Sequence, residues 1–372
     1  MRHQLPRLVL VALTAALTTG AAPAGHAALR GVYQGRIGEN LAIVLRINEI
    51  DPQEGGAYHY TNRGLDIRLG VHAEGNRFTL TEQGRWQPEA DRFTVTGVFT
   101  GSVNGNTLVG MWRSGDGRRQ YPFRLTRVQP TSLRPNLPDS PKLREWRTND
   151  PYTFLKVNRA FQPTRKARMV GGVRIEEWRE PLAGVTAYRV TNLHGRAAQD
   201  RVNGLLQDDA LQEAVHALEC RSDAALAPAG IEGYWEAERR VLYASPRFLS
   251  IHKRVGYFCG GAHPGEFVEP HAYDLTTGRE VTPAHLFDFG NEAQHLIPIA
   301  RRFYPKDAPE GCARVVTDRP SVIVTFAAKG LIVQYDVPHV AAVCGLTETL
   351  VPYAALKHLA NPKSSVYREF YP

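Results

Sequence analysis

Cysteine is scarce in this 372-residue chain, and it is unevenly placed. There are four cysteines, and none occurs before Cys220. Because the first half has no thiol, a lipid anchor on a cysteine near the N-terminus is excluded. No CxxC pair is present, so the usual spacing of a structural zinc site is missing, and zinc is the competing interpretation rather than the first one. No metal ligand is assigned.

If the chain is exported, as its first residues indicate below, two disulfides are the default for four cysteines. Four cysteines allow three pairings. We favour Cys220 with Cys259 and Cys312 with Cys344, because loops that are local in the sequence close most easily.

Familiar catalytic signatures are also missing. The chain has no GxSxG nucleophile elbow, no HExxH, no Walker loop and no dinucleotide-binding glycine pattern. With the cysteines expected to be paired, a thiolate nucleophile is not expected either. The sequence therefore assigns no catalytic residue, predicts no cofactor and predicts no nucleic-acid partner.

Long hydrophobic runs are absent. The longest candidate, Leu8 to Leu17, has about half of the roughly twenty residues that a membrane-spanning helix needs. Arg2 and Arg7 precede it, and small residues follow as far as Ala27, which is the order of a secretory signal peptide. We expect residues 1–27 to be this signal peptide, the mature chain to have no transmembrane segment, and its location to be periplasmic or secreted.

The formal net charge is +8. Removal of Arg2 and Arg7 with the leader would leave +6, since 8 minus 2 is 6 and no acidic residue is lost. A positive surplus favours anionic neighbours such as wall polymers or lipid headgroups, although simple solubility explains it as well.

Residues 28–128 alternate with period two, as β-strands do. Leu41, Ile43, Leu45 and Ile47 share one parity, and the pattern recurs at intervals as far as Leu125. Turn sequences such as Gly75-Asn76 and Asn104-Gly105 separate the strands. About eight short antiparallel strands in one hundred residues predict a small β-barrel or a barrel-like sandwich.

The segment 129–150 is polar and holds four prolines. Because proline disfavours helix interiors and central strands, we expect an extended linker here.

Residues 151–372 mix both periods. The pattern predicts helices over 200–220 and 291–304, a strand over 248–259 and two strands over 322–335 around a turn at Lys329-Gly330. These elements are interspersed without a regular βαβ rhythm. The predicted fold class is therefore α+β, with an N-terminal antiparallel β-barrel domain followed by a C-terminal α+β domain.

The most informative passage runs from Tyr257 to Phe289. It contains the sequence GGAHP at 260–264, an aromatic strand ending in DLTTG at 274–278, and Leu286-Phe287. Near the end of the chain follow Gly330-Leu331 and PYAALK at 352–357. In this order the motifs resemble the extracytoplasmic domain of the lysozyme-binding anti-sigma factor RsiV, which also accompanies some peptidoglycan deacetylases, over residues 165–358.

This resemblance implies a recognition module, since the deacetylase chemistry belongs to a separate metal-binding domain. The function we expect is a non-catalytic cell-envelope binding protein that recognises a lysozyme-type muramidase or peptidoglycan. The net positive charge differs from the charge expected of a lysozyme receptor, because a negative face would increase the rate of encounter with basic lysozyme. The candidate binding residues are Gly260, Gly261, His263, Glu266, Glu269 and His271.

A catalytic alternative uses the same passage. His263, Glu266, Glu269 and His271 offer enough imidazole and carboxylate groups for zinc, and a metal-dependent envelope hydrolase or deacetylase would follow. However, strand alternation would place Glu269 and His271 on one face and Glu266 on the other. For His263 we favour a hydrogen bond to the backbone of its own loop.

Overall fold

The computed structural model describes residues 29–290, 292–317, 321–337 and 342–372. The expected signal peptide, 1–27, lies outside the described residues. Within them, no helix combines the length and the apolar character that crossing a membrane requires.

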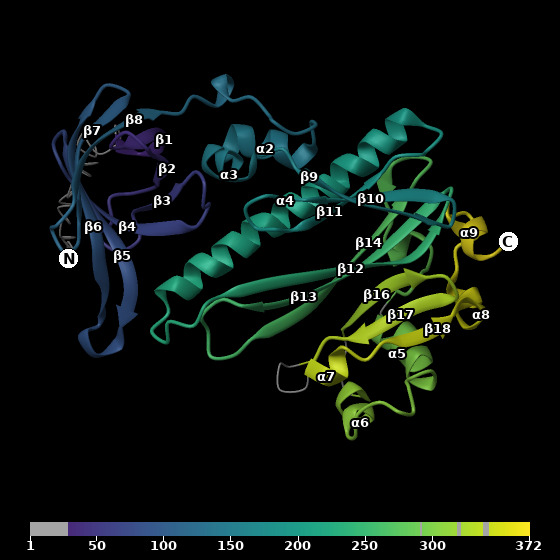
Figure 1. The fold of residues 1–372 in the computed structure, drawn as a ribbon. Helices are drawn as coiled ribbons and strands as arrows, with labels where there is room; N and C mark the ends of the chain where they lie inside the picture. The colour runs from purple at the N-terminus through teal and green to yellow at the C-terminus, as the bar shows by residue number, and fades with distance from the viewer. Residues whose placement is uncertain (1–28, 291, 318–320, 338–341) are drawn as a thin grey trace, which may run out of the picture.

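The N-terminal part is a closed barrel of eight antiparallel strands, which confirms the predicted architecture (Figure 1). Strand β1 pairs with both β2 and β8 and so closes the sheet. Gly75 and Gly105 adopt positive φ in tight turns, as their sequences predict. The strands are β1 Gly31–Ile37, β2 Leu41–Ile47, β3 Gly56–Tyr60, β4 Asp66–Glu74, β5 Arg77–Gln87, β6 Arg92–Asn104, β7 Thr107–Ser114 and β8 Gln120–Arg127.

Side chains pack across the barrel interior. The rings of Tyr58 and Phe99 lie 5.5 Å apart, and those of Phe99 and Phe123 lie 5.3 Å apart. Glu82 is buried among them and accepts hydrogen bonds of 2.6 Å from the Tyr58 hydroxyl and the Trp112 indole. A buried carboxylate needs such donors, so this part of the interior is a packed core.

The proline-rich segment differs from the expected extended linker. It contains α2 (Pro141–Asn149), and α3 (Pro151–Val157) follows directly. Pro141 occupies the first turn of α2, where the missing N–H costs nothing, and the side chain of Ser140 caps the helix. Leu143 and Trp146 are buried beneath it. Proline therefore starts this helix rather than preventing it, and the division of the chain into domains stays a prediction.

Two sheets and one long helix form the middle of the chain. The first sheet has the order β11-β10-β9, and the second has the order β12-β13-β14-β15. Helix α4 (Arg196–Leu226) lies across them (Figure 1) and includes the predicted helix 200–220. The strands are β9 Gln162–Val170, β10 Val173–Arg179, β11 Thr186–Val190, β12 Tyr234–Ser245, β13 Phe248–Phe258, β14 Gly265–Asp274 and β15 Arg279–Glu280.

The last part of the chain adds a third sheet, of order β16-β17-β18. It packs on the face of the β12–β15 sheet that α4 leaves open, where the hydroxyl of Ser250 donates 2.7 Å to the carbonyl of Phe326. The mixture of strands and helices confirms the α+β class. The elements are α5 Glu292–Arg302, α6 Cys312–Thr317, β16 Val322–Ala327, β17 Gly330–Tyr335, α7 Ala342–Gly345, β18 Thr349–Pro352, α8 Tyr353–Leu356 and α9 Tyr367–Phe370.

Both predicted disulfides are present. Cys220 in α4 is bonded to Cys259, the residue after β13. Cys312 at the start of α6 is bonded to Cys344 in α7. The pairing of sequence-local cysteines is confirmed, and the first bridge fixes the end of β13 to the long helix.

The barrel contacts the rest of the chain through a buried polar cluster. Lys156 of α3 is 2% exposed, and its ammonium lies 2.7 Å from the carboxylate of Asp66 in β4. The hydroxyl of Tyr152 donates 2.6 Å to the other oxygen of Asp66. His59 of β3 is fully buried beside them, with its ring 5.0 Å from that of Tyr152. The barrel is thus held by specific charges as well as by apolar packing.

Candidate functional site

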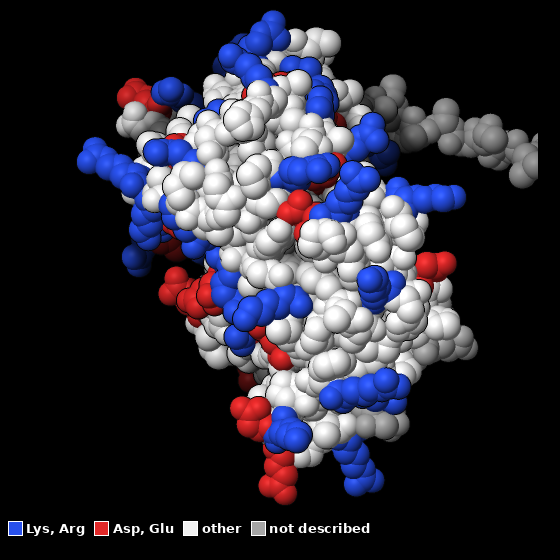
Figure 2. All heavy atoms as spheres, turned by 90° about the vertical axis from the view of Figure 1, so that its right-hand side faces the viewer, with Lys and Arg blue, Asp and Glu red and all other residues white. Residues whose placement is uncertain are grey.

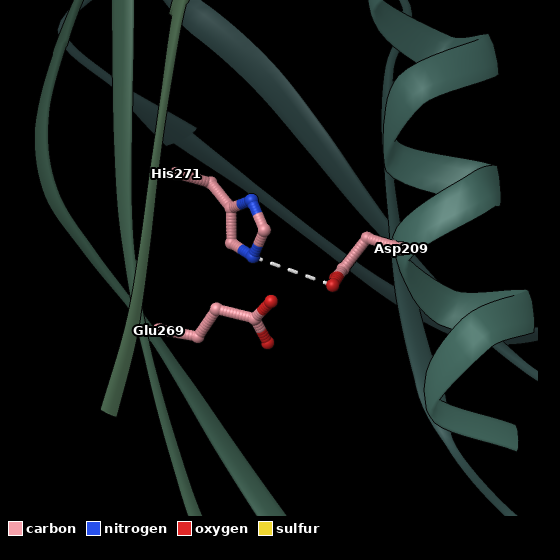
Figure 3. A group of neighbouring side chains, drawn as sticks. All are labelled: Asp209, Glu269 and His271. Atoms are coloured by element: carbon pink, nitrogen blue, oxygen red, sulfur yellow. Dashed lines mark ion pairs between the residues drawn. The ribbon is translucent and has the colours of Figure 1, made fainter. Parts of the chain in front are cut away.

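The densest group of titratable side chains lies between α4 and β14. Asp209 and Glu213 are one helical turn apart and face the sheet. Glu269 and His271 are two residues apart in β14, so their side chains lie on the same face of that strand. Figure 3 shows Asp209 reaching from the helix toward the two strand residues. They line a groove of about 320 Å³ that also includes Gln212, His216, Trp235 and Phe267.

Three of these side chains could hold a metal ion. One ligand atom each from Asp209, Glu269 and His271 lies within 4.8 Å of the others. The sequence identified Glu269 and His271 but missed Asp209. A signal existed, because Asp209 and Glu213 interrupt the inward face that Val202 and Leu206 begin at helical spacing.

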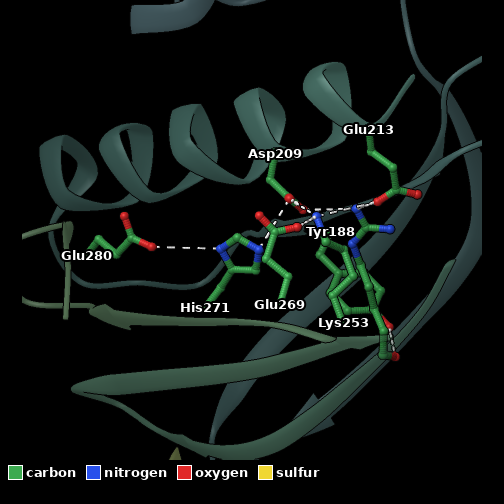
Figure 4. A network of polar contacts seen from close by, with 8 residues as sticks. Tyr188, Asp209, Glu213, Lys253, Glu269, His271 and Glu280 are labelled. Atoms are coloured by element: carbon green, nitrogen blue, oxygen red, sulfur yellow. Dashed lines mark hydrogen bonds and ion pairs between the residues drawn. The ribbon is translucent and has the colours of Figure 1, made fainter. Parts of the chain in front are cut away.

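An ammonium group already lies among the three donors. Lys253 of β13 is 3% exposed; its Nζ contacts Asp209 and lies 2.6 Å from Glu269 and 3.7 Å from Glu213 (Figure 4). A divalent cation here would have to displace that ammonium and leave it buried without its partners, which is strongly unfavourable. The donor set is therefore satisfied by the chain itself.

Arg239 of β12 supplies a second internal cation. Its guanidinium lies 2.9 Å from Asp209 and also contacts Glu213. Burial alone would lower the pKa of Arg239, but the two carboxylates outweigh it and raise that pKa. Four carboxylates of the cluster, Asp209, Glu213, Glu269 and Glu280, thus face three cationic groups, Arg239, Lys253 and His271.

The pKa shifts reflect attraction between opposite charges in this cluster. We call the cluster the ion-pair clamp; it consists of Asp209, Glu213, Arg239, Lys253, Glu269, His271 and Glu280. Burial raises the pKa of Glu213. For Asp209, burial acts in the same direction, but His271, Arg239 and Lys253 overcome it and lower the pKa below its ordinary value. For His271, burial is overcome by Asp209 and Glu280, and the pKa rises to about 9. His271 Nε2 lies 3.3 Å from Asp209 Oδ1, an ion pair whose angle is not that of a hydrogen bond.

A protonated His271 limits the chemistry of the groove. Only a neutral imidazole binds a metal or accepts a proton, and the carboxylates on both sides keep the proton on the ring at neutral pH. Together with Lys253, this arrangement ties α4 to the sheet.

We expect His271 to remain protonated at about pH 8 and to titrate near pH 9. Asp209→Asn removes the closest carboxylate, so the pKa should fall, because burial and Lys253 both disfavour the charged ring. Ring chemical shifts followed by NMR from about pH 5 to 10 measure this. Glu236→Gln, on the opposite face of the sheet, is the control. An equal pKa in all three proteins would contradict the clamp.

The remaining candidate residues lie elsewhere. Gly260, Gly261 and His263 belong to the loop between β13 and β14, and Glu266 contacts Arg254 on the face of β14 opposite to Glu269. The predicted alternation is thus confirmed. His263 is exposed, and its Nδ1 lies 3.4 Å from the carbonyl of the next residue, within its own loop as expected. The six residues therefore face three different surfaces.

The position directly after Cys259 requires a glycine, and Gly260 occupies it. Its φ is +87°, and a Cβ there would lie 2.7 Å from the Cβ of Ala227 and 2.9 Å from the Cα of Ala224. The loop therefore approaches the end of α4 too closely for any side chain. With Cys259 bonded to Cys220, the loop is anchored to the helix at two consecutive positions.

Aromatic rings close one end of the groove. The indole of Trp235 lies 5.5 Å from the ring of Tyr257, 5.8 Å from that of Phe267 and 5.8 Å from the imidazole of His216. Another cavity, of about 470 Å³, lies between α4 and β11 and is lined by Trp178 and Phe161, but it lacks a comparable cluster of titratable groups. The α4–β14 groove is thus the candidate site.

Comparison with solved structures shows similarity to bacterial proteins of the DUF3298 family over about half of the chain. A family member from Bacteroides fragilis has a TM-score of 0.38 and 14% identity, covering 57% of this chain and 96% of that chain. A family protein from Pseudomonas aeruginosa has a TM-score of 0.27 and 21% identity, covering 36% of this chain and 63% of that chain. No protein-family model and no curated protein matches the chain. The RsiV resemblance stays a prediction.

Proposed function

We propose that this chain is a non-catalytic binding protein of the cell envelope that recognises a lysozyme-type muramidase or peptidoglycan. The observation that carries the proposal is the position of Lys253 among Asp209, Glu213 and Glu269. The possible metal ligands Asp209 and Glu269 are already ion-paired with cationic groups of the chain itself, Lys253 and, at Asp209, Arg239. Such a cluster is suited to holding a surface rigid.

The two disulfides support a location outside the cytoplasm. All four cysteines are paired, and disulfides form and persist in oxidising compartments. A periplasmic or secreted location follows from this as part of the proposal, in agreement with the leader expected at residues 1–27.

The loop 260–264 supports a docking role. The bridge at Cys259 and the close approach of Gly260 to α4 fix its base, while Gly261 to Pro264 are exposed. A preorganised surface loses little conformational entropy on binding, which favours affinity. The candidate binding residues Gly260, Gly261 and His263 therefore keep their place in the proposal, with Glu266, Glu269 and His271 on the neighbouring strand.

The test mixes the purified protein with lysozyme and follows the lysis of isolated cell walls. Capture of the muramidase should abolish lysis at a stoichiometric ratio, and sedimentation with insoluble peptidoglycan should reveal binding to the wall. Ovalbumin in place of the protein controls for crowding. Absence of binding in both assays would contradict the proposal.

A metal-dependent hydrolase or deacetylase is the second candidate, favoured by the approach of Asp209, Glu269 and His271. The same preparation distinguishes it. Turnover of cell walls by the protein alone, with stoichiometric zinc that EDTA removes together with the activity, would replace the binding proposal with the catalytic one.

A further inference from the structure

The cavity between α4 and β11, which we call the α4–β11 cavity, lies apart from the α4–β14 groove. Its volume of about 470 Å³ is within the range of small-molecule sites. Its walls come from residues 136–139 of the proline-rich segment, residues 160 and 161 before β9, and the neighbouring parts of β10, β11 and α4. Segments distant in the sequence thus enclose one space.

One wall of the α4–β11 cavity is apolar. Trp178 of β10 pairs with Ala187 of β11, and both line the cavity together with Phe161 and Leu137. The side chains of Trp178 and Phe161 are half-buried, so part of each stays accessible. A ligand with an apolar group would cover surface that the chain itself leaves open, which favours binding.

Helix α4 provides a polar wall. Asp200, Gly204 and Gln207 follow one another at steps of four and three residues, so they share one side of the helix. Gln207 is 8% exposed, and its Nε2 donates 2.8 Å to the carbonyl of Pro138. No described residue donates to its Oε1, which is not sealed off from solvent. A fixed and accessible acceptor of this kind is suited to an N–H group of a ligand.

Gly204 has no packing reason to be glycine. A Cβ there would approach only the Cβ of Ser140, at 3.9 Å, which is an ordinary contact, and its φ is not positive. Glycine inside a helix is destabilising relative to alanine. The space beside Gly204 therefore stays open at a cost to the helix, and it lets a ligand approach the backbone closely.

One charge of each sign remains available at the α4–β11 cavity. The guanidinium of Arg189 lies 5.4 Å from the centre of the indole ring and forms no ion pair with a described residue. Asp200 lies 3.9 Å from Arg196, but both side chains are mostly exposed, so that pair is weak. The other carboxylate at the cavity, Asp139, is held by Arg144.

The outer surface offers no comparable selection. On the face drawn in Figure 2, Lys and Arg lie scattered, with Asp and Glu between them. Scattered surface charges are screened by salt and do not fix the orientation of a ligand. A positive and a negative group beside an apolar wall are more specific, because they fix two ends of a small molecule.

We propose that the α4–β11 cavity binds a free amino acid with an apolar, preferably aromatic, side chain. The carboxylate of the ligand pairs with Arg189, its ammonium meets Asp200 and the Oε1 of Gln207, and its side chain lies against Trp178 and Phe161. A zwitterion supplies a partner for each charge at the cavity. The inference goes beyond the proposed function and does not depend on it, since the loop 260–264 does not line this cavity.

Isothermal titration calorimetry with L-phenylalanine tests the proposal. Three analogues each lack one recognised group: phenethylamine lacks the carboxylate, phenylpropionate lacks the ammonium, and glycine lacks the side chain. Each analogue should bind about tenfold more weakly or worse, because each leaves one part of the cavity without its partner. Binding of any analogue as tightly as phenylalanine, or no binding of phenylalanine at millimolar concentration, would overturn the inference.

Gly204→Leu tests the location of the ligand. The position has room and leucine is a strong helix former, so the melting temperature should not fall while the affinity for phenylalanine is lost. Gly256→Leu is the matched control, because a Cβ at Gly256 also meets nothing within 4 Å but that residue does not line the cavity. Full affinity in a folded Gly204→Leu protein would contradict the assignment.

Arg189→Gln gives a second test at an exposed position, where the fold is not at risk. It should reduce the affinity for phenylalanine to that of phenethylamine and leave the affinity for phenethylamine unchanged, because the variant loses only the partner of the carboxylate. An unchanged preference for phenylalanine would overturn the inference. The assays with lysozyme and cell walls are separate from these titrations, so failure of either proposal leaves the other standing.

Discussion

Asp66→Ala should destabilise the protein by about 3–5 kcal/mol, because it leaves the ammonium of Lys156 buried without its carboxylate. Lys156 is 2% exposed and lies 2.7 Å from Asp66. The same substitution removes the acceptor of the Tyr152 hydroxyl at 2.6 Å. Because the Lys156 side chain is buried, the loss of its carboxylate partner leaves most of the desolvation cost uncompensated.

Urea-induced unfolding at neutral pH, followed by tryptophan fluorescence, measures this loss. The chain offers a matched control in the Arg68–Asp223 pair, which has the same 2.7 Å separation but side chains 40% and 50% exposed. Asp223→Ala should therefore cost at most about 1 kcal/mol. Adding Lys156→Met to Asp66→Ala should recover part of the loss. An equal cost for the two aspartates would contradict the role of the buried pair.

Much of the fold could be predicted because the decisive patterns are local. Period-two alternation from Leu41 onward revealed the barrel, since each strand buries one face. The helices and strands of the C-terminal part followed in the same way, and the preference for pairing cysteines that are nearest in the sequence predicted both disulfides. In each case neighbouring residues in the sequence share one environment.

The sheet of β9 to β11 was not predicted. Nearly all residues of β9 are exposed on both faces, so the strand carries no hydrophobic alternation to detect. Helix α2 was hidden for a different reason, because Pro141 reads as a helix breaker until its position in the first turn is known.

The site was harder to predict because its partners are distant in the sequence. Lys253 and Glu269 face each other on neighbouring strands, but Asp209 comes from a helix more than forty residues earlier. Alternation could say that Glu269 and His271 share a face. It could not say that a buried lysine lies between them and the helix, and that lysine decides whether the cluster is a metal site or an ion-pair clamp.

Acid should weaken the junction between the barrel and α3 through His59. This imidazole is fully buried, and among the described residues neither ring nitrogen has a hydrogen-bond partner. Burial is the largest cause that lowers its pKa, to about 3, followed by the charge of Lys156; Arg159 and Arg46 act in the same direction, and Asp66 opposes them. Protonation would add a charge to a site that already faces three cations.

The direction of the pH effect follows from the two pKa values. An unfolded histidine has a pKa of about 6.5, so the unfolded chain takes up a proton below that pH while folded His59 stays neutral until about pH 3. The stability that neutral His59 contributes is complete above about pH 6.5 and is lost progressively as the pH falls toward 3. By pH 4.5 the accumulated loss relative to the fully neutral state is about 2.7 kcal/mol, or two units at about 1.36 kcal/mol each.

His59→Leu should therefore flatten the acid limb of the stability curve, since leucine has a similar volume and takes up no proton. The measurement is urea unfolding of wild type and variant at several values between about pH 4.5 and 7. His72→Leu, at an exposed position of the adjacent strand β4, is the control and should keep the wild-type slope. The acid response of Asp209 is common to all three proteins and cancels in the comparison. If His59→Leu loses stability as steeply as wild type, the acid sensitivity of the junction arises from its carboxylates, and the buried imidazole has no part in it.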